Sequence, residues 1–234
     1  MSPTARQRRR GPRRVLSEDE VLDAAQSLLD QGGTEAVSVR GIANAVGLAP
    51  NAIYTYFSSK AALMEALAER LLGQVDHGVL AARDQPWRHR AEAFALELRA
   101  HLTAHPGAVE LIMGSRLNGP HALVLNEMLL DLFAEAGLDP DTAARSAYVL
   151  AVYILGAMAR EVAGLRDTSS EPSEQRRVAA RLQTLAETPT DRYPRTAAAA
   201  DTIADRISTE QYLWGLHRVL DGITAAGGAA ESGT

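Results

Sequence analysis

Apolar residues recur at intervals of three and four along most of this chain, the spacing that places them on one face of an α-helix. The first such stretch has helix signals at both ends. Ser17 and Glu20 are spaced as a capping box, and Leu16 and Val21 are placed for a hydrophobic staple. The apolar stripe that follows consists of Val21, Leu22, Ala25, Leu28 and Leu29. The pair Gly32-Gly33 is expected to end this helix.

Two short helices joined by a three-residue turn are predicted next. Ser38 can cap a helix from Val39 to Val46, Gly47 interrupts it, and Pro50 suits the first position of the following helix. The apolar positions that would pack this pair against the first helix are Ile42, Ala43, Val46, Leu48, Ile53 and Phe57. This order of three helices is that of a helix-turn-helix module.

A fourth helix begins after the pair Ser58-Ser59, and we expect it to connect the module to the rest of the chain. It carries the apolar residues Leu63, Met64, Leu67, Leu71 and Leu72. Beyond Pro86 the helical spacing continues to the end of the chain. We expect helices near 87–104, 107–117, 120–137, 141–164, 174–187 and 202–225.

Two of these helices carry wide apolar stripes. The helix near 141–164 has Ala144, Ala147, Tyr148, Ala151, Ile154, Leu155, Met158 and Val162. The last helix has Ile203, Ile207, Leu213, Leu216, Leu220 and Ile223. Each stripe is wide enough to pack against its own domain and against a second copy of the chain, which predicts a homodimer with a four-helix interface. Residues 165–200 are polar and predict a mobile excursion with at most one helix.

Composition agrees with a packed helical protein. The chain has 234 residues, 46% of them hydrophobic, which suffices for one bundle and a small module. Aromatic residues are only 5%, while Ala and Leu are frequent, so the predicted fold class is all-α. The absence of Cys excludes a disulfide framework and thiolate metal sites. With neither a signal-peptide pattern nor a run of about 18 apolar residues, we expect a cytoplasmic protein that does not enter a membrane.

The net charge of -5, taken alone, disfavours a nucleic-acid partner, but the distribution of charge reverses that inference. Residues 1–60 carry eight basic and six acidic residues, so their net charge is +2, and the remainder has -7. Residues 1–14 hold six Arg and no acid, and are predicted to be a disordered arm. Such an arm could contact a minor groove or phosphates, or it could only increase solubility.

The segment of residues 37–67, VSVRGIANAVGLAPNAIYTYFSSKAALMEAL, resembles the signature of the tetracycline repressor family of bacterial regulators. The match covers about the first 70 residues and rests on Arg, Ile-Ala, Gly, Tyr, Phe and Lys at set distances. It implies that residues 50–56 form the helix that lies in the major groove of DNA. The side chains expected to face outward are Pro50, Asn51, Ala52, Thr55 and Tyr56.

The resemblance also implies roles for residues around that helix. Arg40 matches a position that often contacts a base edge or a phosphate, and Tyr54 and Lys60 match positions that commonly bind the DNA backbone. Arg can bind guanine bidentately, whereas Lys neutralises phosphate as a point charge. Tyr54 or Tyr56 could instead cover the core, and Arg40 could be a solvated helix residue. Ala49 stands where the family often has a Ser or Thr cap, whose loss typically costs about 1 kcal/mol.

The second half resembles the C-terminal domain of the tetracycline repressor branch of this family, through Trp87 and residues 104–138 and 152–164. This implies a ligand pocket framed by the helices near 91–104, 107–117, 120–137 and 141–164. Such pockets are mostly apolar with a few polar groups. The candidates, each of which could also be core or surface, are Leu98, His101, His105, Met113, Arg116, Asn118, Leu129, Phe133, Tyr153, Ile154, Ala157 and Glu161.

No cofactor and no metal are expected. By alignment, Ile112 falls where tetracycline-binding members carry a metal-coordinating His, and Val152 falls where a second such His would be. Because hydrocarbon cannot coordinate the ion, recognition of magnesium-tetracycline is disfavoured.

The chain is therefore expected to comprise a disordered Arg-rich arm (1–14), a helix-turn-helix DNA-binding domain (15–60), a connector helix (61–75), a ligand-binding and dimerisation domain (76–226) and a disordered tail (227–234). We expect a regulator whose dimer binds a palindromic double-stranded operator with recognition helices about 34 Å apart. A small, largely apolar effector, drug-like or polyketide-like, would release the DNA. Repression is favoured, and activation stays open because the sign depends on where the operator lies.

Two other functions compete with this one. An enzyme is disfavoured, because the sequence has no nucleophile elbow, H-E-x-x-H motif, P-loop or dinucleotide fingerprint. A helical dimer whose DNA module has become a partner-binding scaffold is permitted by the uncapped helix. The intact Arg40, Tyr54 and Lys60 argue against it.

Overall fold

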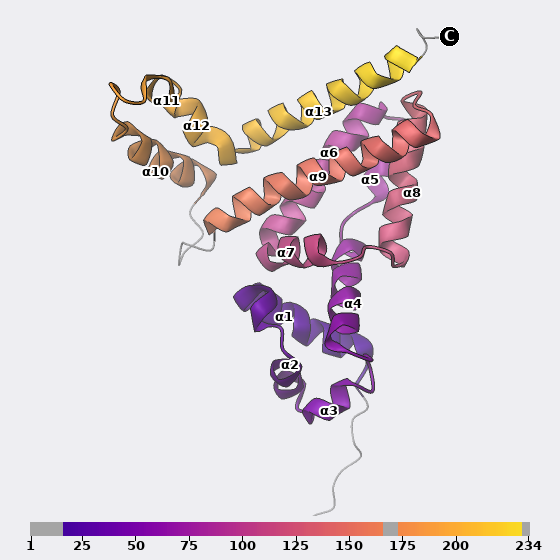
Figure 1. Ribbon diagram of the computed structural model, residues 1–234. Helices are drawn as coiled ribbons and strands as arrows, with labels where there is room; N and C mark the ends of the chain where they lie inside the picture. Colours follow the sequence, from indigo (N-terminus) through magenta and orange to yellow (C-terminus); the bar gives the residue numbers. More distant parts are fainter. Residues whose placement is uncertain (1–15, 166–172, 231–234) are drawn as a thin grey trace, which may run out of the picture.

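The computed structural model of the protein describes residues 16–165 and 173–230, and every regular element in these ranges is a helix (Figure 1). This confirms the predicted all-α fold class. The predicted N-terminal arm, residues 1–14, lies outside the described residues.

The N-terminal part of the structure contains three helices and the start of a fourth. They are α1 (Glu18–Ala36), α2 (Val39–Val46), α3 (Pro50–Ile53) and α4 (Lys60–Gly73). Helix α4 runs from this part into the larger part of the molecule, as Figure 1 shows. It therefore occupies the place expected of the connector.

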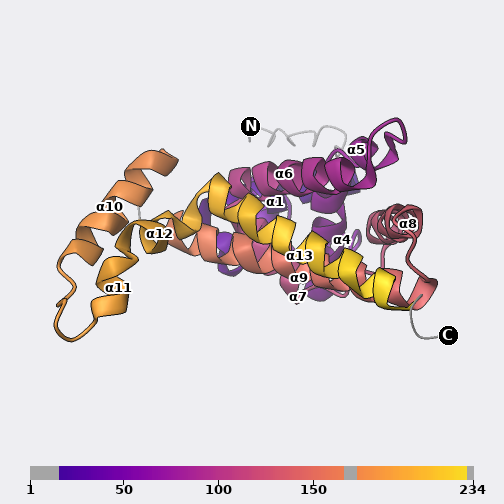
Figure 2. The ribbon, with the colours of Figure 1, turned by 90° about the horizontal axis from the view of Figure 1, so that it is seen from above.

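The larger part contains both long and short helices. They are α5 (Gly78–Ala81), α6 (Trp87–Ala104), α7 (Pro106–Gly114), α8 (Pro120–Glu135), α9 (Pro140–Leu165), α10 (Glu174–Ala186), α11 (Pro194–Ala198), α12 (Ala200–Ala204), the 3-10 helix η1 (Asp205–Ile207) and α13 (Thr209–Ala230). Helices α9 and α13 lie side by side at the end of the molecule far from α3, and α10 to α12 project to one side (Figures 1 and 2).

The capping signals in the sequence fix three helix starts. The Glu20 backbone N–H donates to Ser17 Oγ over 3.2 Å, and the Ser17 backbone N–H donates to the Glu20 carboxylate over 2.9 Å, which confirms the capping box. Ser38 caps α2 by accepting from the backbone N–H of Gly41, and Ser59 caps α4 in the same way. The helical backbone of α1 is interrupted at the predicted glycine pair, where Gly33 has φ 69°.

One hydrophobic core runs through both parts of the structure. Leu29 of α1, Leu71 of α4, Ile112 of α7 and Leu150 of α9 belong to the same buried cluster. Because the core is continuous across α1, α4 and α7, a displacement in the larger part can be transmitted to the N-terminal helices through packed side chains.

The structure differs from the predicted elements near the C-terminal end. The helix predicted over 202–225 is broken, because Ser208 is extended and its Oγ accepts the backbone N–H of Gln211, which starts α13 there. The segment 165–200 contains both α10 and α11, not at most one helix. Helix α13 also continues to Ala230, into the tail predicted to begin at residue 227.

Helix α9 is the one described helix that is long and apolar enough to cross a membrane, judged by length and composition alone, and buried helices pass the same test. It packs against α6, α7, α8 and α13, as a core helix does. It also carries the buried carboxylate of Glu161, which is ion-paired within the protein. These contacts make α9 a packed helix of the bundle.

Candidate functional site

The α2–α3 surface presents most of the side chains nominated for DNA. Arg40 on α2 and Lys60 at the start of α4 are exposed, and so are Asn51 and Thr55. Tyr54 is 51% exposed, so it does not cover the core of the module. Pro50 is also exposed, whereas Ala52 and Tyr56 are partly buried, and Tyr56 packs on the hydrophobic core.

The turn between α2 and α3 is held by a glycine. Gly47 has φ 71°, a left-handed conformation that side chains with a Cβ rarely adopt, and its N–H closes the end of α2. Directly after it, the Leu48 N–H donates to the Ala43 carbonyl over 2.8 Å. This geometry turns the chain sharply and brings α3 out beside α2.

Regular helix in α3 covers only Pro50–Ile53, shorter than the predicted 50–56. No side chain caps its start at Ala49. Single helical turns continue the segment, because the N–H of Thr55 donates to the Ala52 carbonyl and that of Tyr56 to the Ile53 carbonyl. The Thr55 hydroxyl also donates to the Ala52 carbonyl over 2.7 Å. The segment is therefore ordered by Pro50, by turns and by packing of Ile53.

Charge is arranged favourably for an anionic partner on this surface. Residues 37–60 contain Arg40 and Lys60 and no acidic residue. The acids of residues 16–60 all lie on α1, where Arg70 pairs with Asp19 and Asp23. The exposed α2–α3 surface thus has a positive charge although the whole chain is acidic.

A mostly apolar cavity of about 380 Å³ lies between α4, α6, α7, α8 and α9. Three of the nominated residues, Leu98, Leu129 and Ile154, line it. The other lining residues are Leu72, Phe94, Ile112, Leu117, Ala122, Leu123, Leu125, Asn126, Ala144, Ala147, Tyr148, Leu150, Ala151 and Leu155. We call this the apolar cavity. Ile112 thus faces the cavity with hydrocarbon, whereas Val152 is 51% exposed and is not among its lining residues.

Other nominated residues lie away from the apolar cavity. Tyr153, Ala157 and Glu161 line a different cavity, between α9, α10, η1 and α13. Met113 is exposed on α7, and Phe133 is fully buried with its ring 6.1 Å from that of Trp87.

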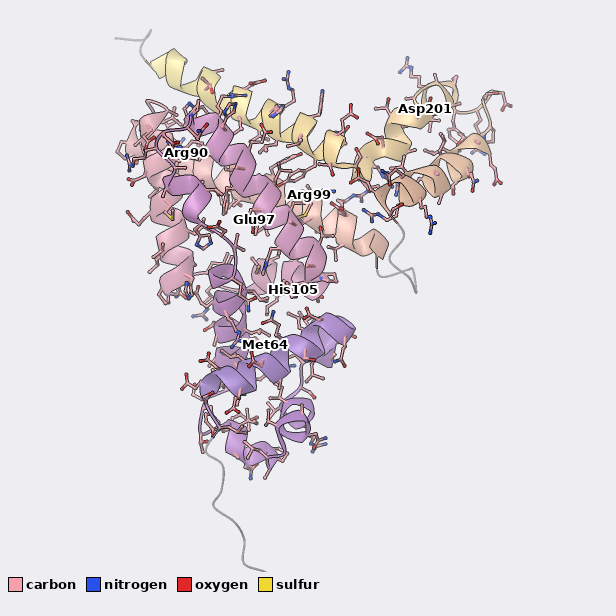
Figure 3. The ribbon with its side chains drawn as sticks, turned by 180° about the vertical axis from the view of Figure 1, so that it is seen from behind. Met64, Arg90, Glu97, Arg99, His105 and Asp201 are labelled. Carbon is pink, nitrogen blue, oxygen red and sulfur yellow. The ribbon has the colours of Figure 1, made fainter. Side chains whose placement is uncertain are left out.

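The polar candidates also lie elsewhere. Arg116 and Asn118 are exposed on the α7–α8 connection, and Arg116 Nε lies 3.8 Å from a Glu65 carboxylate oxygen. His101 and His105 lie at the junction with the N-terminal part, and Figure 3 labels His105 there. Burial, together with the neighbouring His105, lowers the pKa of His101. None of these four polar candidates lines the apolar cavity.

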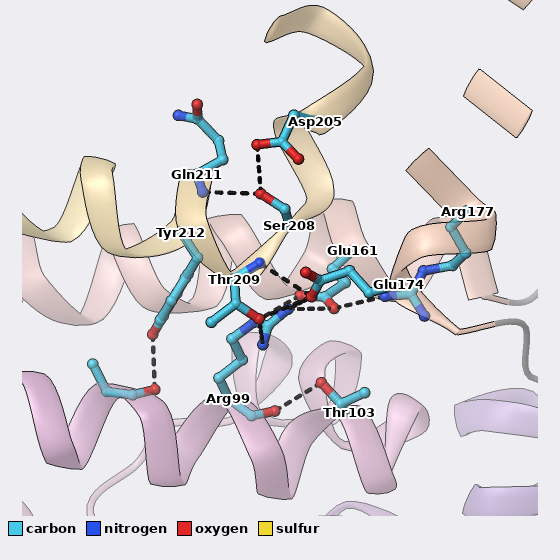
Figure 4. Close-up of polar contacts among 11 residues, drawn as sticks. Arg99, Thr103, Glu161, Glu174, Arg177, Asp205, Ser208, Thr209, Gln211 and Tyr212 are labelled. Carbon is cyan, nitrogen blue, oxygen red and sulfur yellow. Dashed lines mark hydrogen bonds and ion pairs between the residues drawn. The ribbon is translucent and has the colours of Figure 1, made fainter. Parts of the chain in front are cut away.

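A buried ion network joins α6, α9, α10 and the start of α13 (Figure 4). Arg99 donates to both oxygens of Glu161, over 3.0 and 2.9 Å, and also to Glu174 and to the Thr209 hydroxyl. Arg177 donates to Glu161 over 3.2 Å. Burial acts to raise the pKa of Glu174, but hydrogen bonds from Thr209 and Arg99 hold it below its usual value. The sequence alone does not predict this network, since it depends on the fold.

Two contacts tie the connector α4 to the helices around the apolar cavity. Leu72 of α4 is itself part of the cavity lining. Glu69 of α4 accepts the backbone N–H of His121 over 2.8 Å, at the start of α8, where the helix has free N–H groups. A change in the cavity would therefore act on α4 through both apolar contact and a hydrogen bond.

Helix α7 packs directly on α1. A Cβ on Gly107 of α7 would lie 2.7 Å from the backbone oxygen of Leu29, so the close approach depends on glycine. Beside it, His105 Nδ1 and Asp30 Oδ1 are 3.0 Å apart. Helix α1 thus rests on the larger part at one point and on α4 at another, where Arg70 pairs with Asp23.

Two family models match the chain. Residues 21–67 match the model of bacterial regulatory proteins of the tetR family, and residues 81–226 match the model of the tetracyclin repressor-like C-terminal domain. Within the described residues, no group of three or more His, Asp or Glu is arranged to hold a metal ion.

The similar proteins include transcriptional regulators from Streptomyces and Saccharopolyspora. The HTH-type transcriptional repressor DrrR1 of Streptomyces coeruleorubidus is 26% identical over 225 residues, 94% of this chain and 82% of the relative. An HTH-type transcriptional regulator of Saccharopolyspora erythraea is 28% identical over 147 residues, 63% of this chain and 61% of its own length. A crystal structure of a possible TetR family regulator from Streptomyces coelicolor has TM-score 0.76 and 26% identity, covering 90% of this chain and 100% of that one.

Proposed function

Because this chain belongs to the tetracycline repressor family of bacterial transcriptional regulators, we propose that it is a repressor released from its operator by a small, largely apolar effector. The observation that carries the proposal is the apolar cavity, which includes Leu72 of the connector α4. Cavities that bind drug-sized ligands commonly measure about 300–1,000 Å³ and are lined mainly by apolar groups.

The operator is read by the α2–α3 surface. The exposed Asn51 and Thr55, with Pro50 and Ala52 beside them, meet base edges in the major groove. Tyr54 and Lys60 bind the phosphate backbone, and Arg40 meets a phosphate or a guanine. The partly buried Tyr56 contacts the DNA from the edge of the α3 segment.

A homodimer places two such surfaces on a palindromic operator. Exposed apolar side chains on the two longest neighbouring helices support this: Tyr148, Val149 and Val152 on α9 are 71%, 46% and 51% exposed, and Trp214 on α13 is 60% exposed. Two helices from each protomer would bury these side chains in a four-helix interface. Recognition helices one DNA turn apart, about 34 Å, then fit two half-sites.

The dimer is tested by Val152→Glu, which puts a charge at the centre of the proposed interface. Sedimentation of the purified variant should reveal a monomer, and DNA affinity should fall because one protomer holds one half-site. Met113→Glu, at 57% exposure on α7, is the matched control and should leave the dimer intact. A Val152→Glu variant that sediments as the wild type does would reject this interface.

Release follows from the contacts of α4. An effector in the apolar cavity displaces Leu72 and the start of α8, which Glu69 binds, and α4 carries α3 with it. The spacing of the two recognition helices changes, and the operator is lost. A neutral apolar compound fits this lining better than a magnesium chelate, because Ile112 offers hydrocarbon to the cavity.

The effector site is tested with a neighbouring pair of positions on α8. Leu123 and Val124 are similarly exposed, at 54% and 53%, but only Leu123 lines the apolar cavity. We expect Leu123→Trp to abolish both effector binding and effector-induced DNA release, while Val124→Trp leaves them unchanged. Candidate effectors are first found as compounds that raise the melting temperature of the wild type. Their ability to release each variant from operator fragments is then measured. Equal release in both variants would place the effector elsewhere.

A further inference from the structure

The cavity between α9, α10, η1 and α13 differs in chemistry from the apolar cavity. Its volume is about 550 Å³, and its lining includes one arginine from each of three elements: Arg160 of α9, Arg181 of α10 and Arg206 of η1. We call it the arginine cavity. The proposed repressor function uses neither this space nor these side chains.

The three arginines have no anionic partner among the residues that the structure describes. None of them takes part in an ion pair or side-chain hydrogen bond there, and the buried Nε of Arg181 has no acceptor. Burial, together with the nearby Arg206 and Arg160, lowers the pKa of Arg181 from its usual value. Three like charges thus lie around one cavity, with Arg181 partly buried and Arg160 and Arg206 exposed, and an anion there would be attracted by all three.

The acid that lines the same cavity does not neutralise them. Glu161 is 5% exposed at its side chain and is held by Arg99 at both oxygens and by Arg177. Its charge is therefore already matched inside the ion network of Figure 4. The positive charge of the arginine cavity remains available for a ligand.

Aromatic rings form part of the cavity lining. Tyr153 and Tyr212 are stacked, with centroids 5.8 Å apart and an angle of 28° between the planes. Their hydroxyls are engaged elsewhere, because each donates to a backbone carbonyl, that of Tyr212 and that of Ala95. Trp214, which also lines the cavity, belongs to the proposed dimer interface. The rings therefore offer apolar surface to a ligand.

We propose that the arginine cavity is a second ligand site, which binds an organic acid with a planar apolar body. The guanidinium groups of Arg160, Arg181 and Arg206 hold the acid group, and Tyr153 and Tyr212 contact the body. Guanidinium binds carboxylate in a planar, bidentate geometry that no neutral group reproduces. The acid would link α9 to α10 and η1, since each supplies one arginine.

The binding test uses the full chain and two compounds of the same shape. 1-Naphthoate carries the acid group on a fused ring pair, and 1-naphthamide replaces it with a neutral amide. Calorimetric titration at low ionic strength should give naphthoate an affinity at least about tenfold higher. Arg181→Gln should remove this difference, whereas Arg176→Gln, an exposed position of the same helix, should retain it. Equal binding of acid and amide, or an unaffected Arg181→Gln variant, would overturn the proposal.

The melting temperature of the Arg181→Gln variant shows whether Arg181 binds a ligand or stabilises the fold. Without ligand, Arg181→Gln should raise the melting temperature, because it removes one of three neighbouring unpaired cations; a structural arginine would lower it. Naphthoate should slow backbone hydrogen exchange of α10 and η1 in the wild type and not in the variant. A lowered melting temperature, or no protection of α10, would contradict the proposal. If a carboxylate of a second copy occupied the cavity, naphthoate would fail to bind, and the site would be rejected.

Discussion

Lys60 combines two features at one residue: its side chain is exposed, and it starts α4 beside the cap formed by Ser59. A phosphate there would meet both an ammonium group and the free N–H groups of the helix start. The residue therefore contributes affinity without sequence preference. Asn51 and Thr55, which are exposed on the α3 segment, contribute the preference.

Lys60→Ala should weaken binding to all DNA sequences and reduce the slope of log affinity against log salt concentration by about one. Asn51→Ala should change which sequences are preferred and leave that slope unchanged. Both are measured by fluorescence anisotropy over a range of salt concentrations. A salt slope that is the same in Lys60→Ala and the wild type would remove Lys60 from the phosphate contacts.

Two histidines near the domain junction make stability depend on pH. Burial is the main cause that lowers the pKa of His77, with His121 adding to it, and the pKa of His101 is lowered by burial and by His105. The folded protein thus binds fewer protons than the unfolded chain below the usual histidine pKa. The free energy of unfolding should fall as the pH drops through about 6.5.

The double variant His77→Gln, His101→Gln should lose part of that pH dependence in denaturant titrations between about pH 7.5 and 5.5. His89→Gln, at an exposed position of α6, is the control and should behave as the wild type does. If the double variant and the wild type lose stability equally on acidification, other groups are responsible.

At the scale of elements, α3 is the least supported helix that the proposed function needs. It has regular helical structure only over Pro50–Ile53 and no side-chain cap at Ala49. Ala49→Ser should supply the missing acceptor and stabilise the segment by about 1 kcal/mol. Operator affinity should then rise, because less ordering is needed on binding. Ala45→Ser, exposed on α2, is the control; equal affinity of Ala49→Ser and this control would mean that α3 is already ordered in the free protein.

The sequence predicted the helices whose starts carry a recognisable capping residue. Ser17, Ser38 and Ser59 cap their helices as expected, and α6 coincides with the predicted range 87–104. The short helices α5 and α11 have no side-chain cap and were missed. The break before α13 has a cap, Ser208, but the apolar spacing continues across it and concealed it.

The candidate ligand residues could be predicted only in part, because a cavity depends on how helices meet. Tyr153 and Ile154 are neighbours in sequence, yet Tyr153 lines the arginine cavity and Ile154 the apolar cavity. Arg160, Arg181 and Arg206 are far apart in the chain, and each alone reads as a surface residue. Their convergence is a property of the tertiary structure.

In the whole molecule, contacts between the two parts decide whether effector binding in the larger part can change DNA binding by the N-terminal part. Gly107→Ala should separate α7 from α1, because the new methyl group would lie 2.7 Å from the Leu29 backbone oxygen. We expect a loss of about 1–3 kcal/mol in stability and weaker operator binding. Gly114→Ala, in the same helix with nothing within 4 Å of the added Cβ, should have neither effect. Unchanged operator binding by a folded Gly107→Ala variant would show that this contact does not position α1.

The proposed function requires a dimer that reads a specific operator. It is tested most directly by selecting bound fragments from random DNA with the full chain and sequencing them. A dimeric regulator should enrich a palindrome whose half-site centres are about one helical turn apart. Recovery of no preferred sequence would contradict it, and would favour a helical dimer whose N-terminal module has become a scaffold for another partner.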